Sequence, residues 1–261
     1  MILADLRKLI VDIEKRSTKR MAPAPGEDCS PWSFGVGDID RALPNRRLCS
    51  RSLHDISTTS PGDRSAACGF AFALLSRLPR RGDVLWCQLI SDAREYGALY
   101  GPGLRWLGID PGRIIQVRVR SPGDLAWVME EAVRSAGLRA VVGEGPGLHF
   151  TATRRLALAC EQAGIPCLYV NLNGAMRASA AATRWQIKAK VAPDEGINMP
   201  GPGAAAWSLS LTRCRGGSTG KWQLYWSYET FSFHMVAAAG DRKVPAYPVP
   251  AGTVIALRRA G

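Results

Sequence analysis

The chain has 261 residues, 46% of them hydrophobic and 21% charged, which is the composition of a globular protein large enough to bury a substantial core. Its net charge of +12 favours a polyanionic partner such as nucleic acid, although a generally basic proteome would produce the same balance. It has no Cys-x-x-Cys pair, no clustered histidines and no apolar run near the ~20 residues of a membrane span. Its first ten residues carry charges within their apolar pattern, so we expect no signal peptide. We therefore expect a cytoplasmic protein with free thiols, no metal, no cofactor and no membrane partner.

Residues 1–16 are predicted to form an amphipathic helix, because their apolar side chains recur at helical spacing among charged ones. Residues 17–32 contain three prolines and are predicted to be a linker. The apolar stripe of the helix either folds back onto the chain's own core or docks on another subunit or protein, and both alternatives stay open. The candidate partner-binding residues in the stripe are Leu6, Leu9, Ile10 and Ile13.

The rest of the chain is organised around residues 53–78. A short predicted strand at 53–56 leads through a loop of Ser, Thr, Pro and Gly into a helix at 66–78 that is small and apolar almost all round. This order of strand, tight loop and buried helix is typical of a phosphate-binding P-loop. The stretch therefore has the outline of a nucleotide site.

The residues that nucleotide chemistry requires are replaced in this loop. The P-loop spacing G-x-x-x-x-G-K-[ST] aligns its two glycines with Ser57 and Gly62, its lysine with Asp63 and its hydroxyl residue with Arg64. An acid at the lysine position would repel phosphate, and the hydroxyl that would bind Mg²⁺ is absent. We therefore predict no nucleotide binding at the loop, no catalytic residues and no enzyme activity.

After this stretch, predicted strands and helices alternate. The strands are expected at 84–90, 114–119, 138–142 and 165–170, and the helices at 96–107, 122–136 and 151–163. Ser121 as N-cap, Pro122 in the first turn and Gly137 at the end bound the second of these helices, and Gly164 closes the third. Such alternation indicates an α/β fold with a mainly parallel sheet.

The pattern changes in the C-terminal part of the chain. Three segments of alternating character, 184–191, 206–213 and 221–228, indicate strands, and the glycine-rich turn at 214–220 joins the last two as a β-hairpin. We therefore expect one core over residues 33–228 with a β-rich end. Residues 229–261 form a weakly defined tail.

Basic and aromatic side chains gather in this β-rich region. Cations bind phosphates and aromatic rings stack on bases, so the region is a candidate DNA-binding surface. In the alternative interpretation, the aromatic side chains are core and the cations are a solvated face; the alternation favours core for the aromatic side chains. The candidate DNA-binding residues are Arg177, Arg184, Lys188, Arg213, Arg215 and Lys221, and the aromatic residues near them are Trp207, Trp222, Tyr225 and Trp226.

Several strings, taken in order, resemble a known family. They are SFGVGDIDRAL, LHDI, GDRSAACGFAFALLSRL, VLWCQ, LYGPGLRWLGID, VVGE, TATRRLALACEQAG, TRWQI and LTRCRGG, and they lie within residues 33–228. Their order resembles the RecA core. The sequence more closely resembles the ImuA family, which comprises RecA-like, SulA-related proteins of bacterial mutagenesis cassettes.

This resemblance implies a RecA-like α/β core with an N-terminal amphipathic helix and a C-terminal β-rich segment. It places Glu144 at the Walker B position, and it places Tyr96 where RecA has its catalytic glutamate, with Glu95 one residue away. The stretches that hold Arg177, Arg184 and Lys188 resemble the DNA-facing loops of RecA.

The resemblance also implies a noncatalytic accessory role in the SOS response, in DNA-damage-induced translesion synthesis. The implied partners are an ImuB-type protein related to Y-family polymerases, RecA, an error-prone DnaE-like polymerase, single-stranded DNA and further copies of the chain. One alternative is a RecA-superfamily ATPase or recombination regulator with a rearranged P-loop. A SulA-like inhibitor of cell division is disfavoured, because such proteins are shorter.

Overall fold

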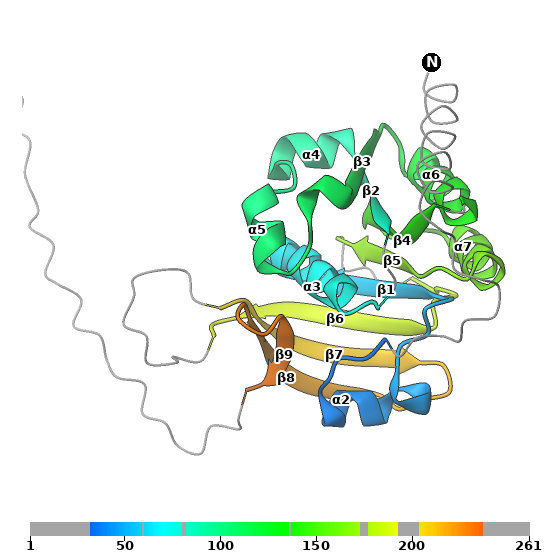
Figure 1. Cartoon of the computed structure of the whole chain (residues 1–261). Coiled ribbons are helices and arrows are strands. Elements are labelled where there is room, and N and C mark those ends of the chain that lie inside the picture. Colours follow the sequence, from blue (N-terminus) through cyan, green and yellow to red (C-terminus); the bar gives the residue numbers. More distant parts are fainter. Residues whose placement is uncertain are drawn as a thin grey trace, which may run out of the picture.

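The computed structural model describes residues 32–58, 60–79, 82–135, 137–172, 177–192 and 204–236, and they share one nine-stranded sheet with helices on both faces (Figure 1). The strand order is β3-β2-β4-β5-β1-β6-β7-β8-β9. Neighbouring strands from β3 to β6 pair in parallel, and the pairs from β6 to β9 are antiparallel. The predicted α/β class is confirmed, and the arrangement is consistent with a RecA-like core.

The elements lie close to the predicted ranges. The strands are β1 (Leu53–Thr58), β2 (Asp83–Leu89), β3 (Ile114–Val119), β4 (Leu138–Gly145), β5 (Cys167–Asn171), β6 (Thr183–Lys190), β7 (Ala206–Cys214), β8 (Gly220–Ser227) and β9 (Ser232–Met235). The α-helices are α2 (Gly37–Ala42), α3 (Arg64–Ser76), α4 (Ile90–Tyr96), α5 (Gly101–Trp106), α6 (Pro122–Arg134) and α7 (Phe150–Ala163), with short 3₁₀ turns at Pro44–Arg46, Pro61–Asp63 and Pro111–Arg113.

Two hydrophobic cores lie on opposite faces of the sheet. On one face, α2 and α3 pack against strands from β2 through β9, and the core there includes Trp86, Trp185 and Phe233. On the other face, α6 and α7 cover strands β1 to β5. Figure 1 shows α6 and α7 side by side, close to the parallel strands. Central parallel strands are buried on both faces, which explains why their sequences are almost continuously apolar.

The predicted boundaries of two helices can be compared with the structure. Ser121 accepts a hydrogen bond from the backbone N–H of Asp124 (3.1 Å), so the predicted N-cap of α6 is confirmed. Gly164 ends α7 in the left-handed conformation at φ 71°, as a C-terminal glycine commonly does. The prediction that Gly137 ends α6 is wrong, because the chain leaves the helix at Ser135.

The single helix predicted over residues 96–107 is also wrong. The chain forms two short helices there, α4 and α5, separated by residues 97–100. Gly97 ends α4 at φ 90°, a backbone conformation that residues other than glycine rarely adopt. Pro102 then begins α5 in its first turn, where proline is favoured.

The predicted hairpin is confirmed, since β7 and β8 pair antiparallel on either side of the glycine-rich turn. A further strand, β9, pairs with β8 and lies in the segment that the sequence left as a weakly defined tail. Residues 1–31 and 237–261 lie outside the described residues, and so does the predicted helix with Leu6, Leu9, Ile10 and Ile13. No helix in the described part of the chain is long and apolar enough to cross a membrane.

Candidate functional site

The loop after β1 is folded on itself rather than left open. Ser57 is buried at the end of β1, and its hydroxyl donates to the backbone oxygen of Trp185 (3.1 Å). Gly62 and Asp63 belong to a 3₁₀ turn, in which their backbone N–H groups donate to the hydroxyl and carbonyl oxygens of Ser60 (3.2 and 3.0 Å). A P-loop binds phosphate through such N–H groups, but these two already have acceptors.

Asp63 is held by the neighbouring strand. Its Oδ1 accepts a hydrogen bond from the backbone N–H of Ala189 in β6 (2.8 Å). The side chain at the lysine position of the P-loop spacing therefore joins the loop to the sheet, with its negative charge beside a backbone donor. This contact is structural and places no cation at the loop.

Arg64 begins α3 and is buried, with 8% of its surface exposed. Its Nε and Nη2 donate to one oxygen of Glu144, Oε1, at 2.9 and 2.7 Å. Glu144 lies at the carboxyl end of β4 and is also buried. In α/β sheets with parallel strands, ligands bind at the carboxyl ends of the strands, so the pair fills the place where a ligand of this fold would be expected.

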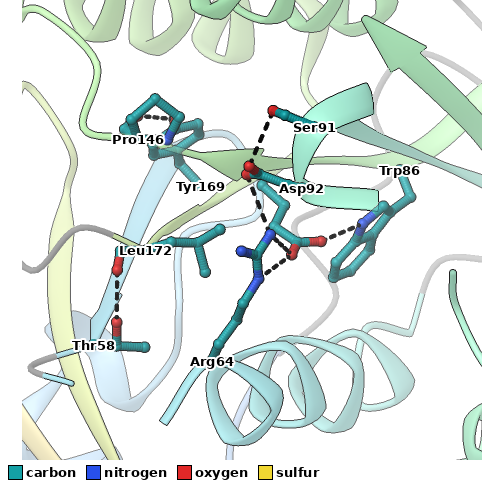
Figure 2. Close-up of polar contacts among 9 residues, drawn as sticks. Thr58, Arg64, Trp86, Ser91, Asp92, Pro146, Tyr169 and Leu172 are labelled. Carbon is teal, nitrogen blue, oxygen red and sulfur yellow. Dashed lines mark hydrogen bonds and ion pairs between the residues drawn. The ribbon is translucent and has the colours of Figure 1, made fainter. Parts of the chain in front are cut away.

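Three further side chains complete the cluster, and Figure 2 shows two of them, Asp92 and Trp86. Asp92 in α4 contributes a second carboxylate 3.2 Å from Nη2 of Arg64. Trp86 in β2 donates its indole N–H to the other oxygen of Glu144, Oε2, at 3.1 Å. The ring of Tyr96 lies over the guanidinium of Arg64, 3.8 Å from carbon to ring centroid. We call Arg64, Glu144, Asp92, Trp86 and Tyr96 the arginine cluster.

The electrostatics of the arginine cluster favour the charged guanidinium. Burial alone lowers the pKa of Arg64, but the hydrogen bonds and charge of Glu144, with the charge of Asp92, outweigh it and raise that pKa overall. Burial raises the pKa of the nearby Cys68 thiol well above its usual value, and the negative charge of Glu144 adds to the effect. Cys68 therefore stays a neutral thiol and not a reactive thiolate.

A nucleotide with Mg²⁺ would need a Walker B acid that can face the metal and a cation that can reach the phosphates. Both oxygens of Glu144 accept hydrogen bonds from Arg64 and Trp86, and the guanidinium of Arg64 lies between two carboxylates. A metal ion at Glu144 would have to displace a buried cation. As arranged, the cluster stabilises the loop, α3, β4 and α4 against one another.

The geometry can be set beside known proteins. No protein-family model matches the sequence. Two proteins named Protein ImuA, from two strains of Caulobacter vibrioides, are each 31% identical to the chain over 233 residues, which covers 82% of this chain and 92% of each relative. The chain belongs to the ImuA family. Membership of the ImuA family relates it to the translesion mutagenesis cassettes that the sequence resemblance suggested.

The sequence of this ImuA-family protein predicted part of the arginine cluster. Arg64 and Glu144 were singled out separately, as a replaced hydroxyl and a Walker B acid, and the structure brings them together. Asp92 and Trp86 were missed. The replacement of a small hydroxyl residue by arginine was itself a signal, because a buried guanidinium requires acidic partners.

The candidate DNA-binding residues of this ImuA-family protein differ in exposure and in their partners. Arg184 is largely buried in an ion pair with Asp55 (3.3 Å). Arg213 and Arg215 donate to the backbone oxygens of Ser179 and Ala180 (2.7 and 3.2 Å), which ties them to the segment before β6. Arg177, Lys188 and Lys221 are exposed. Whether any of these residues binds DNA stays a prediction.

The aromatic residues of the β-rich region divide by face. Trp207 and Trp226 are buried, and their indole N–H groups donate to the backbone oxygens of Ala66 and Trp106 (2.8 and 3.1 Å). The interpretation of these two as core is therefore confirmed. Tyr225 is next to Trp226 in β8 and therefore lies on the opposite face of the sheet.

Proposed function

We propose that this ImuA-family protein is a noncatalytic, RecA-like accessory protein of DNA-damage-induced translesion synthesis. The observation that carries the proposal is the pair of hydrogen bonds that Arg64 donates to Oε1 of Glu144. Removing one partner of a buried ion pair costs about 3–5 kcal/mol, and a nucleotide that needed Glu144 would have to overcome that cost before gaining any contact. The protein therefore keeps the packing of the fold without its nucleotide switch.

Nucleotide binding and turnover test this proposal directly. The full chain is titrated with ATP and Mg²⁺ in a calorimeter, and phosphate release is followed at saturating ATP. We expect neither heat of binding nor turnover, because the N–H groups of Gly62 and Asp63 and both oxygens of Glu144 already have partners. Saturable turnover that Glu144→Gln removes would instead support an ATPase with a rearranged loop.

The proposal extends to partners. A RecA-like core without turnover can still offer surfaces to other proteins, and the partners that the sequence resemblance implies are an ImuB-type protein, RecA and an error-prone DnaE-like polymerase. Purified candidates can be tested pairwise by size-exclusion chromatography with light scattering, which also reports assembly of the chain with itself. If no candidate co-elutes with the chain, the accessory role is contradicted.

A further inference from the structure

One face of the sheet is covered over only part of its width. The core beneath α6 and α7 draws residues from β1 to β5 and, within the described residues, none from β6, β7, β8 or β9. Figure 1 shows α6 and α7 beside the parallel strands and far from β8 and β9. On this side, the antiparallel end of the sheet is therefore an open face in the described part of the chain.

The alternation of side chains determines what this face presents. Trp185, Ile187 and Leu209 point to the opposite face and are buried in the core with α3. The residues that alternate with them along β6 and β7 point to the open side, and so do their register partners on β8 and β9. Those used below are half-buried or exposed. We call this surface the open sheet face and use six of its residues below: Lys188, Lys190, Lys221, Gln223, Tyr225 and His234.

The open sheet face is basic. Strands β6, β7, β8 and β9 contain no Asp or Glu. Lys188, Lys190 and Lys221 are exposed, and none of them has an ion-pair partner within the described residues. Two carboxylates lie beside β6, and both have partners there: Asp63 accepts the N–H of Ala189, and Asp55 pairs with Arg184. A polyanion would thus meet three available cations.

The open sheet face also carries stacked rings. Tyr225 and His234 are register partners on β8 and β9, with ring centroids 5.3 Å apart and an interplanar angle of 24°. The hydroxyl of Ser232 lies 2.9 Å from Nε2 of His234 and orients that ring. Aromatic side chains on a basic surface are the platforms on which unpaired bases stack.

We propose that the open sheet face binds single-stranded nucleic acid. The three lysines contact phosphates, and the Tyr225–His234 pair stacks against bases. This inference deepens the proposed function, because it gives an accessory protein of translesion synthesis a contact with an unpaired strand. Its test measures oligonucleotide binding and not ATP turnover, so the two can fail separately.

The arrangement favours a single strand over a duplex or an acidic protein. Lys188 and Lys190 are two residues apart on one strand, about 7 Å, while Lys221 lies two strands away, about 12 Å from Lys188. Such a two-dimensional spread suits a flexible strand that crosses the sheet. Stacked rings attract unpaired bases, whereas the bases of a duplex already stack on one another, and an acidic protein would make no use of the rings.

Fluorescence anisotropy with a labelled oligothymidylate longer than ~16 nucleotides, the upper site size of one binding fold, tests the proposal with the full chain. The test variant neutralises the open sheet face by Lys188→Gln, Lys190→Gln and Lys221→Gln. We expect affinity at low salt to fall about tenfold or more, and the slope of log K against log salt to lose about 2, since each phosphate contact of a single strand contributes ~0.7.

The matched control removes the same charge elsewhere, by Arg105→Gln, Arg118→Gln and Arg120→Gln, three exposed arginines on α5, on β3 and just after β3. We expect little change in affinity from it. Tyr225→Leu should weaken binding about fivefold or more and leave the salt slope unchanged. Circular dichroism confirms that every variant is folded.

Three outcomes would overturn the proposal. Equal losses in the two triple variants would mean that net charge alone attracts the strand. Equal competition by a duplex of the same length would remove the assignment to single strands. Competition by polyglutamate as strong as that by oligothymidylate, with no effect of Tyr225→Leu, would assign the face to an acidic protein partner.

Discussion

Arg64 donates two hydrogen bonds to a single oxygen of Glu144, from Nε at 2.9 Å and from Nη2 at 2.7 Å, across 80 positions of sequence. The contact joins the start of α3 to the carboxyl end of β4. In a nucleotide-binding member of this fold, those two places face the phosphates and the metal. Here the side chain of Arg64 occupies the space between them.

The Arg64–Glu144 pair is expected to behave as a coupled unit in unfolding experiments. Arg64→Met removes the cation and leaves two carboxylates without it, so we expect the free energy of unfolding to fall by about 3–5 kcal/mol. Glu144→Gln should also destabilise the protein. Urea denaturation of both single variants and the double variant should show that the double variant loses less than the sum, by about 1–3 kcal/mol.

The control for this cycle is a pair on the surface of α2. Arg41 and Asp38, three residues apart, form an ion pair with side chains 63% and 54% exposed. The same cycle at these two positions should give a coupling of about 0.5 kcal/mol or less. If the buried and the exposed pairs showed equal coupling, the central role of Arg64 in the cluster would be wrong.

Removal of Arg64 should expose a latent divalent-cation site. Asp92 Oδ2 and Glu144 Oε1 both lie within contact distance of the same nitrogen, at 3.2 and 2.7 Å, so the two carboxylates can share one cation. Mg²⁺ binds in proteins through one or two carboxylates and several waters. We expect the melting temperature of Arg64→Ser to rise with millimolar Mg²⁺, while that of the unaltered protein does not; no response in the variant would contradict this.

The indole N–H of Trp86 is expected to stabilise the cluster through its hydrogen bond alone. Trp86→Phe keeps a ring to stack on Phe72, whose centroid is 4.2 Å away, but leaves Oε2 of Glu144 without this donor. The lost hydrogen bond should lower the free energy of unfolding by about 1–3 kcal/mol, and the cavity that the smaller ring leaves at this fully buried position should add to the loss. The control Trp106→Phe, at a side chain that is 58% exposed, should change it by no more than about 0.5 kcal/mol.

His54 should make the stability of the protein depend on pH. Its Nε2 lies 2.8 Å from the backbone oxygen of Cys49, which can only accept, so Nε2 carries the proton. Its Nδ1 therefore accepts from the hydroxyl of Thr183 at 2.7 Å, and that hydroxyl accepts from the indole N–H of Trp185 at 2.8 Å. Burial lowers the pKa of His54 to about 4, so the folded protein holds this ring neutral.

The sign of the effect follows from the two states of His54. The unfolded chain, with a histidine pKa near its usual 6.5, takes up a proton before the folded protein does, so stability is lost as the pH falls from about 6.5 towards 4. Between pH 7 and pH 5 we expect a loss of about 2 kcal/mol. His54→Gln should abolish that slope, and the exposed His149→Gln should leave it unchanged. Comparison of variants is needed because burial raises the pKa of Asp55, which acts in the opposite direction.

Local patterns of sequence were sufficient for much of this structure. Strands β2 and β4 were predicted from continuous apolar runs, because a strand buried on both faces is apolar throughout. Strands β7 and β8 were predicted from alternation, because a strand buried on one face is apolar at every second residue. Ser121 marked the start of α6 through its side-chain acceptor, and Gly164 marked the end of α7 through its left-handed backbone conformation. Asp63 and Arg64 departed visibly from the P-loop spacing, since that motif is a local one.

Only the tertiary structure decided what Arg64 does. By itself the sequence determined that a lysine and a hydroxyl were missing from the loop after β1 and that an acid, Glu144, stood at the end of a later strand. The arginine indicated that acidic partners were needed but not which ones, because the contact depends on the start of α3 meeting the carboxyl end of β4. Asp92 and Trp86 entered the cluster for the same reason, since long-range packing and not spacing along the chain brings a buried charge to its partners.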